Sequence, residues 1–223
     1  MGLTGSEDNG ESWRNSDDGF VRDVHVSKLI IDPNNNNVFY ATTQGATEYT
    51  DKVGDGAGVF KSNDRGNSWT QINNGLDSLE TNILTVDPND SETLYLGTDD
   101  DGVYKSTDGG ESWKKLTVSS LSKSFGVGDI IVDPQNSNNI YIGTVDYFRL
   151  SESRGVLGDF GVYKSTDGGA TWEEFNVGLN HLGVFSLELS EENRILYAGT
   201  RAGGVYWISS VSYTHLTLPT MRT

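Results

Sequence analysis

The sequence has no cysteine and only four prolines, and positive charge is scarce. Without cysteine the chain has neither a disulfide nor a thiolate metal site. Its 16 Lys and Arg stand against 32 Asp and Glu, which gives a formal net charge of -16. Because binding of a phosphate backbone depends on clustered Lys and Arg, we predict no nucleic acid partner.

Long hydrophobic runs are also missing. No segment approaches the roughly 20 apolar residues that a membrane helix needs, so we predict no membrane span. The N-terminal MGLTGSEDNG lacks the apolar core of a signal peptide. What the sequence has in plenty is glycine, 27 in all, together with Asn, Asp and Ser. This composition favours many turns and therefore many short strands.

One eight-residue pattern occurs four times: Ser, any, Asp, any, Gly, any, Ser or Thr, Trp. Its fixed positions are Ser6, Asp8, Gly10 and Trp13; Ser62, Asp64, Gly66 and Trp69; Ser106, Asp108, Gly110 and Trp113; and Ser165, Asp167, Gly169 and Trp172. Such a repeat predicts one structural unit that is used several times.

Each of the last three copies lies within the same series of β-branched or aromatic runs. In one unit these runs are ILTVDP at 83–88, TLYLGT at 93–98, GVYKS at 102–106 and SWKKL at 112–116. Runs of this length between turn residues predict four strands, A to D, with the eight-residue pattern as the C–D hairpin. The predicted fold is all-β: a partial β-propeller, an open arc of four-stranded antiparallel blades.

The residue types of the pattern suit a tight hairpin. Its glycine can take a positive φ where the turn is tight. Its aspartate can accept hydrogen bonds from backbone N–H groups that the turn leaves unpaired. Each of the four tryptophans is expected to bury its indole beside the sheet, at positions Trp13, Trp69, Trp113 and Trp172.

The pattern resembles the Asp-box, or BNR, repeat of sialidases, xyloglucanase-type glycosidases, the sortilin ectodomain and photosystem II assembly factors. The resemblance covers nearly all of residues 2–206. In that family the box lies at the blade periphery, away from the ligand. The resemblance therefore implies that the box aspartates are structural, and we expect no bound metal and no cofactor.

The order of the segments predicts incomplete blades at both ends. The expected divisions are a C–D half blade at 1–25, complete blades at 26–75, 80–117 and 127–178, strands A to C of a fifth blade at 184–208, and a non-native tail at 209–223. Residues 211–220, VSYTHLTLPT, resemble translated sequencing-adapter DNA. The chain is interpreted as a fragment whose missing blades are its natural partners and whose open blade faces expose apolar surface.

In a propeller the B–C and D–A loops share one face, which is where a ligand is expected to bind. Two B–C loops are long, at 43–58 and 145–161, and they flank the short DDDG at 99–102. The candidate ligand-face residues are Tyr49, Asp51, Asp99, Asp101, Asp146, Tyr147, Phe148, Arg149 and Asp159. Aromatic rings can stack on sugars and paired carboxylates can hydrolyse glycosides. The alternative is that these are ordinary solvated loop residues.

Two classes of function remain open on the sequence. The first is a secreted or surface propeller that binds polysaccharide or protein. The second is part of a xyloglucanase-type glycoside hydrolase, for which no catalytic residue can be assigned. A sialidase is disfavoured because arginines are few and YFRL at 147–150 only partly matches the sialidase motif. A photosystem-assembly-type scaffold is a further, weaker alternative.

Overall fold

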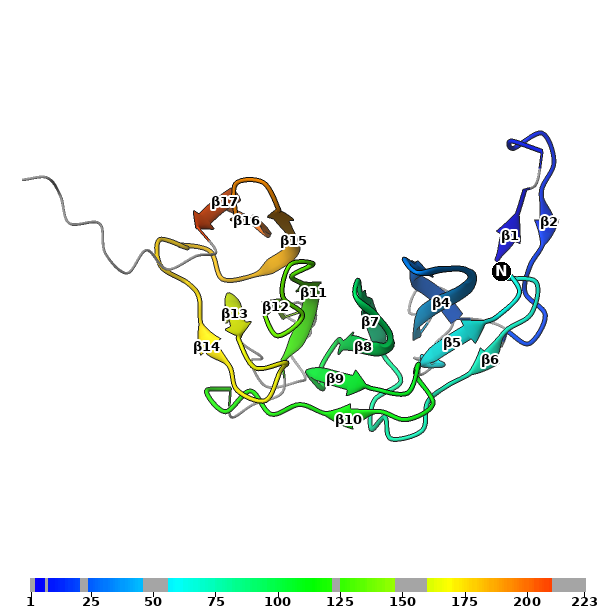
Figure 1. The fold of residues 1–223 in the computed structure, drawn as a ribbon, viewed down its shortest axis with the longest axis horizontal. Coiled ribbons are helices and arrows are strands. Elements are labelled where there is room, and N and C mark those ends of the chain that lie inside the picture. Colours follow the sequence, from blue (N-terminus) through cyan, green and yellow to red (C-terminus); the bar gives the residue numbers. More distant parts are fainter. Residues whose placement is uncertain are drawn as a thin grey trace, which may run out of the picture.

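The structure is a computed structural model and describes residues 3–6, 8–20, 24–45, 56–121, 125–146 and 160–209. The described residues form strands and turns, without a helix that could cross a membrane. Figure 1 shows the sheets standing side by side in an open arc that fans about a common axis. This confirms the predicted all-β, partial propeller fold.

The sheets follow one another in chain order. A two-stranded sheet consists of β1 (Thr4–Gly5) and β2 (Arg14–Asn15). Three four-stranded sheets follow: β3 (Val24–Asp32), β4 (Asn35–Gly45), β5 (Val59–Ser62) and β6 (Thr70–Gln71); β7 (Thr81–Asp87), β8 (Asp90–Thr98), β9 (Val103–Ser106) and β10 (Lys114–Lys115); and β11 (Gly126–Val132), β12 (Ile140–Val145), β13 (Val162–Ser165) and β14 (Glu173–Glu174). The last sheet has three strands, β15 (Val184–Ser190), β16 (Ile195–Thr200) and β17 (Gly204–Ser209).

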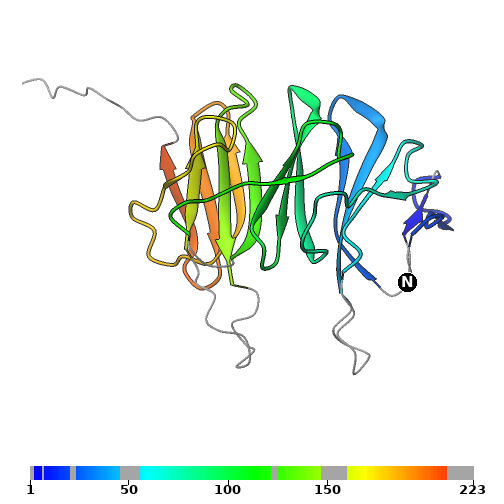
Figure 2. The same cartoon turned by 90° about the horizontal axis from the view of Figure 1, so that it is seen from below.

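We number these sheets as blades 1 to 5. Within each blade, consecutive strands pair antiparallel. The first strands β7, β11 and β15 lie toward the inside of the arc, whereas the short fourth strands β6, β10 and β14 follow its outer side (Figure 1). Viewed from the side, the long strands of neighbouring blades stand next to one another (Figure 2).

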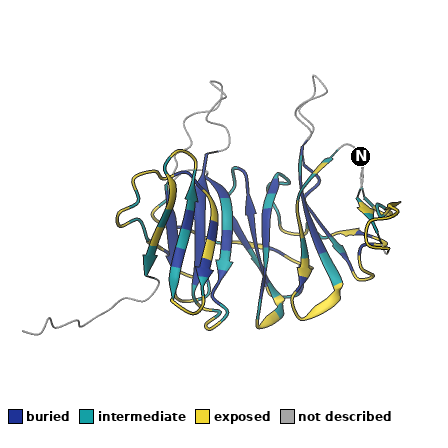
Figure 3. Ribbon diagram, turned by 90° about the horizontal axis from the view of Figure 1, so that it is seen from above, coloured by how far each residue is buried: buried dark blue, intermediate teal, exposed yellow. Residues whose placement is uncertain are grey.

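The core lies between neighbouring blades. One cluster joins Ile83 and Tyr95 of blade 3 to Val127 and Ile140 of blade 4, and Figure 3 shows buried segments along the strands of neighbouring sheets. Close approach requires glycine in the second strand, because a Cβ on Gly97 would lie 2.6 Å from the Cβ of Val127. Each blade is therefore stabilised mainly by its neighbours.

The repeated box folds as a hydrogen-bonded turn. In blade 3 the Asp108 carboxylate accepts hydrogen bonds from the Ser106 hydroxyl at 2.7 Å and from the Ser112 N–H at 2.9 Å. Gly110 has a φ of 92° and donates its N–H to the Ser106 hydroxyl at 2.9 Å. The Ser112 hydroxyl also donates to this carboxylate, and together with the Ser106 hydroxyl and the Ser112 N–H it favours the charged form and lowers the pKa of Asp108 to about 2. In blade 3 the box aspartate therefore accepts hydrogen bonds from within its own turn.

Three of the four box tryptophans are buried, and the prediction for Trp13 is wrong. Trp69, Trp113 and Trp172 are 5%, 5% and 7% exposed, whereas Trp13 is 66% exposed. Trp113 shows the reason, because it packs against Ile72 and Leu76, which follow the fourth strand of the preceding blade. No described strand precedes blade 1, and no described segment covers the Trp13 indole.

Replacing Trp113 with Ala should lower the free energy of unfolding by roughly 3–5 kcal/mol, because a large buried side chain is lost and a cavity remains. Trp13→Ala is the matched control, and its effect should stay within about 0.5 kcal/mol, as for most exposed positions. Urea denaturation followed by circular dichroism measures both. Similar losses of unfolding free energy in the two variants would contradict the burial of Trp113 by the preceding blade.

The box aspartates should also govern acid stability. The pKa of Asp108 is lower in the folded chain than its ordinary value of 3.8, so its contribution is present above pH 3.8 and is lost as the pH falls toward 2. Asp108→Asn removes this titration and should flatten the acid limb of the stability curve. Urea midpoints measured at several pH values from 2 to 5 test this, and an unchanged acid limb would count against it.

Candidate functional site

A recurring hydrogen bond closes the base of every described B–C connection. A threonine within the last three residues of the second strand donates its hydroxyl to the carbonyl of a glycine just before or at the start of the third strand. The two residues are 15, 4, 17 and 4 positions apart in the sequence, so the bond forms whatever the length between them. It joins Thr43 to Gly58, Thr98 to Gly102, Thr144 to Gly161 and Thr200 to Gly204, at 2.8, 3.0, 2.9 and 3.0 Å.

The residue that follows each of these threonines varies in chemistry: Gln44, Asp99, Val145 and Arg201. Because the threonines occupy the same position in each blade, these four residues stand at the same place on successive blades, at the face that carries the B–C loops. A rigid frame with variable chemistry at one repeated position is the usual arrangement of a binding face. We therefore take this position as the centre of the candidate site.

Asp99 is the most unusual residue of this face. Its side chain is nearly buried, with 8% of the residue exposed. The side-chain amide of Gln44, from the neighbouring blade, donates to both carboxylate oxygens at 2.9 and 3.0 Å. Burial raises the pKa of Asp99 to about 7, with smaller upward effects from Glu80 and Asp100, while the Gln44 hydrogen bond opposes the rise. Asp99 can therefore hold or release a proton near neutral pH.

Glu80 fixes the backbone around Asp99. Its carboxylate accepts the N–H groups of Gly45 at 2.9 Å and Gly56 at 2.8 Å, which lie at the two ends of the first long B–C loop. Its carbonyl accepts the N–H of Asp99 at 3.0 Å. One residue thus holds both the loop base and the backbone of the buried carboxyl in place.

The other described candidates have structural partners. The Asp101 carboxylate accepts a hydrogen bond from the Tyr104 hydroxyl and pairs with the Lys115 ammonium, so it stabilises its own sheet. Asp146 is 2% exposed, and its carbonyl accepts a hydrogen bond from the guanidinium of Arg201 in blade 5. The structure therefore places Asp99, Asp101 and Asp146 on the loop face, each with different partners.

A second carboxyl with a raised pKa is Asp129 in β11, where burial again is the main cause. Its oxygens accept the backbone N–H groups of Leu187 at 2.8 Å and Ile130 at 2.9 Å. This carboxyl links blades 4 and 5 and is occupied by the backbone. We regard it as structural.

Six of the predicted ligand-face residues lie outside the described residues: Tyr49, Asp51, Tyr147, Phe148, Arg149 and Asp159. Their roles stay predictions. Sequence reasoning missed Gln44, Glu80 and Arg201, although aligning the blades on the threonine would have identified Gln44 and Arg201. Within the described ranges, no cluster of three or more His, Asp or Glu side chains is arranged to hold a metal ion.

Comparison with known proteins gives a consistent picture. The profile of the Sortilin-Vps10 family, described as sortilin, neurotensin receptor 3, matches residues 57–213. Xyloglucanase Xgh74A from Acetivibrio thermocellus is 36% identical over 95 residues, which cover 39% of this chain and 11% of that protein.

Solved structures of GH74 enzymes also resemble this chain. An ancestral GH74 enzyme superposes with a TM-score of 0.65 at 25% identity, over 83% of this chain and 23% of that one. The GH74 enzyme of Niastella koreensis gives a TM-score of 0.59 at 27% identity, over 83% and 28% of the two chains. The chain thus spans 11%, 23% and 28% of the length of these three relatives.

Asp99 should titrate near pH 7 in an NMR experiment that follows its carboxyl carbon. Because its folded pKa lies above the ordinary 3.8, its contribution to stability is complete below pH 3.8 and is lost as the pH rises through 7. Asp99→Asn should remove that pH dependence, and Gln44→Ala should raise the pKa of Asp99 further. Glu173→Gln, at an exposed position on β14, is the control. A titration near pH 4 would contradict the burial argument.

Proposed function

This chain belongs to the Sortilin-Vps10 family, and from that premise we propose that it is part of a secreted Asp-box β-propeller that binds carbohydrate through its B–C loop face. The observation that carries the proposal is the Asp99 centre. It combines a buried, protonatable carboxyl with the Gln44 amide on the face of the propeller where loops vary. Carboxyl and amide groups are the donors and acceptors that recognise sugar hydroxyls.

The relatives support this choice of ligand. Two GH74 enzymes superpose at 25% and 27% identity, and a xyloglucanase is 36% identical over 95 residues. We propose polysaccharide as the partner, and an extracellular or cell-surface location, where such polymers occur. From the composition of the two long loops, we also propose that Tyr49, Tyr147 and Phe148 stack on sugar rings and that Asp51, Arg149 and Asp159 hydrogen-bond to sugar hydroxyls.

A second function has one observation in its favour. A general acid for glycoside hydrolysis needs a raised pKa, and the pKa of Asp99 is raised to about 7. The chain would then supply one carboxyl of a glycosidase, and the second would come from a part of the protein that the described residues do not include. Binding remains the better-supported function, because it requires no second carboxyl.

Affinity electrophoresis in gels containing xyloglucan tests the binding proposal. The protein should be retarded. Asp99→Ala should lower the affinity derived from the retardation about tenfold or more, since a good hydrogen-bonded contact contributes about 1.5 kcal/mol. Glu173→Gln should be retarded as strongly as the unmodified chain. Unretarded migration in gels with xyloglucan, other β-glucans and mannan would contradict carbohydrate binding. Release of reducing ends that Asp99→Asn abolishes would favour the hydrolase.

A further inference from the structure

The first strands of blades 2 to 5 carry a β-bulge at the end that faces the B–C loops. Pairing with the second strand skips one residue there, and the skipped residues are Ser27, Asn82, Gly128 and Phe185. The Ser27 hydroxyl donates to the Thr81 carbonyl at 2.7 Å. In the next blade the Asn82 amide nitrogen donates to the Val127 carbonyl, also at 2.7 Å. In both cases the acceptor stands just before the bulge of the following blade.

The bond to blade 4 fixes which way the Asn82 amide points. A backbone carbonyl can only accept a hydrogen bond, so the amide nitrogen of Asn82 must face Val127. The amide oxygen, Oδ1, is then left to accept. It does so from Nε2 of Gln44 in blade 2, at 3.3 Å. Blade 4 thus sets the orientation of an amide that contacts blade 2.

Gln44 is oriented in turn. Its amide nitrogen faces three acceptors, Oδ1 of Asn82 and both carboxylate oxygens of Asp99. Turning this amide over would bring Oε1 of Gln44 against three oxygens, none of which can donate while Asp99 is ionised. Among the described residues no group donates to Oε1, so its acceptor capacity is unused. We call Val127, Asn82, Gln44 and Asp99 the amide relay.

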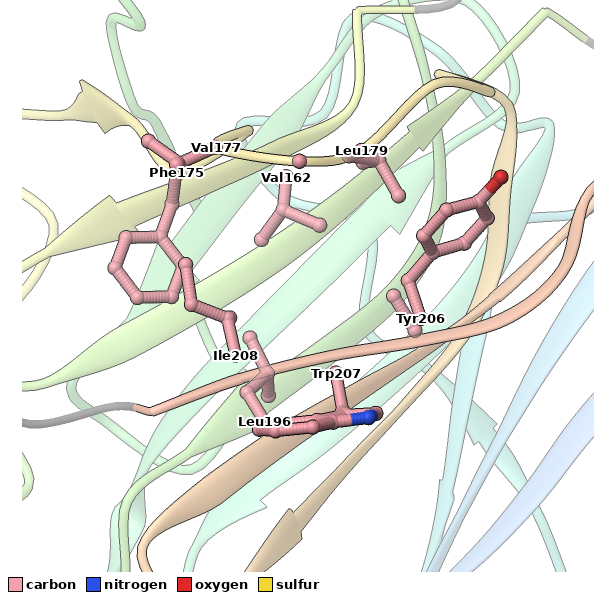
Figure 4. A pocket seen from close by; sticks show the side chains of 10 residues that line it. Val162, Phe175, Val177, Leu179, Leu196, Tyr206, Trp207 and Ile208 are labelled. Carbon is pink, nitrogen blue, oxygen red and sulfur yellow. The ribbon is translucent and has the colours of Figure 1, made fainter.

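The junction of blades 4 and 5 is built differently. Gly128 holds the bulge position in β11, and a Cβ there would lie 2.2 Å from the Val184 carbonyl oxygen, so an amide side chain has no room. A pocket of about 80 Å³ between these two blades is lined mainly by apolar side chains. Figure 4 shows Val162, Phe175 and Leu196 among them. Among the described blades, the amide relay therefore joins blades 2, 3 and 4.

We propose that Asn82 is a positioning residue for the Asp99 site. It fixes the Gln44 amide with its carbonyl oxygen toward the ligand, so that the bound sugar must donate a hydrogen bond at this point. This inference rests on the carbohydrate binding proposed above and adds the direction of one hydrogen bond. A free sugar hydroxyl donates to Oε1 of Gln44, whereas an etherified oxygen has no proton to donate. The site therefore selects free hydroxyls.

The pKa of Asp99, followed by NMR at its carboxyl carbon, tests the positioning without a ligand. In Asn82→Leu the Gln44 amide is free to turn and to accept a hydrogen bond from protonated Asp99. The pKa should therefore rise above its value of about 7. Because Asn82 acts through Gln44, the same substitution in a Gln44→Ala background should shift the pKa much less. Glu80 and Asp100, which also raise this pKa, stay the same in all these proteins.

Ser27→Ala is the matched control. It removes the corresponding bond at the preceding junction, which has the same length of 2.7 Å, and should leave the pKa of Asp99 unchanged. Two results would overturn the proposal: an unchanged pKa in Asn82→Leu, or a rise of the same size with and without Gln44. The second result would mean that Asn82 acts on Asp99 by another route.

Affinity electrophoresis with xyloglucan tests the contact with sugar. Asn82→Ser carries the residue that blade 2 has at this position, so its hydroxyl can still bond the next blade, but it lacks the oxygen that orients Gln44. Its affinity should fall about fivefold, the loss of one hydrogen bond, whereas Ser27→Ala should bind as the unmodified chain does. O-methylated xyloglucan, which has no free hydroxyls, should not retard the protein.

Equal affinity of Asn82→Ser and the unmodified chain, or equal retardation by O-methylated xyloglucan, would overturn the sugar contact. If no polysaccharide retards the unmodified chain, carbohydrate binding itself fails. The pKa measurements separate the two cases, because they decide whether Asn82 orients Gln44 in the absence of any ligand.

Discussion

The packing of the box tryptophans Trp69 and Trp113 against the segment that follows the preceding blade's fourth strand is the contact on which this architecture depends. It combines burial of an indole with two hydrogen bonds to backbone carbonyls, as Trp113 shows with Ile72 and Asn74. Because the contact joins neighbours only, stability is expected to be a sum over blades and their interfaces. Trp113 is buried and Trp13 is exposed, so the same sequence pattern buries its indole only where a preceding blade packs against it.

Because the tryptophan contacts hold the blades together, the sequence of the B–C loop face can vary. The threonine-to-glycine hydrogen bond closes each B–C connection whether the partners are 4 or 17 residues apart. Long loops can therefore be accommodated without disturbing the sheets, and the residue after the threonine can change from Gln44 to Asp99 to Arg201. The buried position of Asp99 between blades follows from the same packing, and it is this burial that raises its pKa.

Much of the fold was predictable because it repeats. Short β-branched runs, turn residues and the fixed box gave the strands and the hairpins, since each feature is local and occurs several times. The exposure of Trp13 was not predictable from the box alone, because burial depends on a neighbour and not on the pattern. Asp99 was a candidate by its place in DDDG, but its contact with Gln44 and the role of Glu80 arise from blade packing. Gln44 and Glu80 each occur once and belong to no repeated motif, so the sequence alone did not identify them.

Hydrogen exchange of the tryptophan backbone amides tests the central contact most directly. The N–H groups of Trp69 and Trp113 donate to carbonyls of the preceding blade at 2.8 Å, and exchange protection reports how often such bonds open. The account predicts slow exchange at Trp69 and Trp113 and fast exchange at Trp13. Equal protection at all three amides would contradict it, because the box alone, and not the neighbouring blade, would then hold the tryptophan in place.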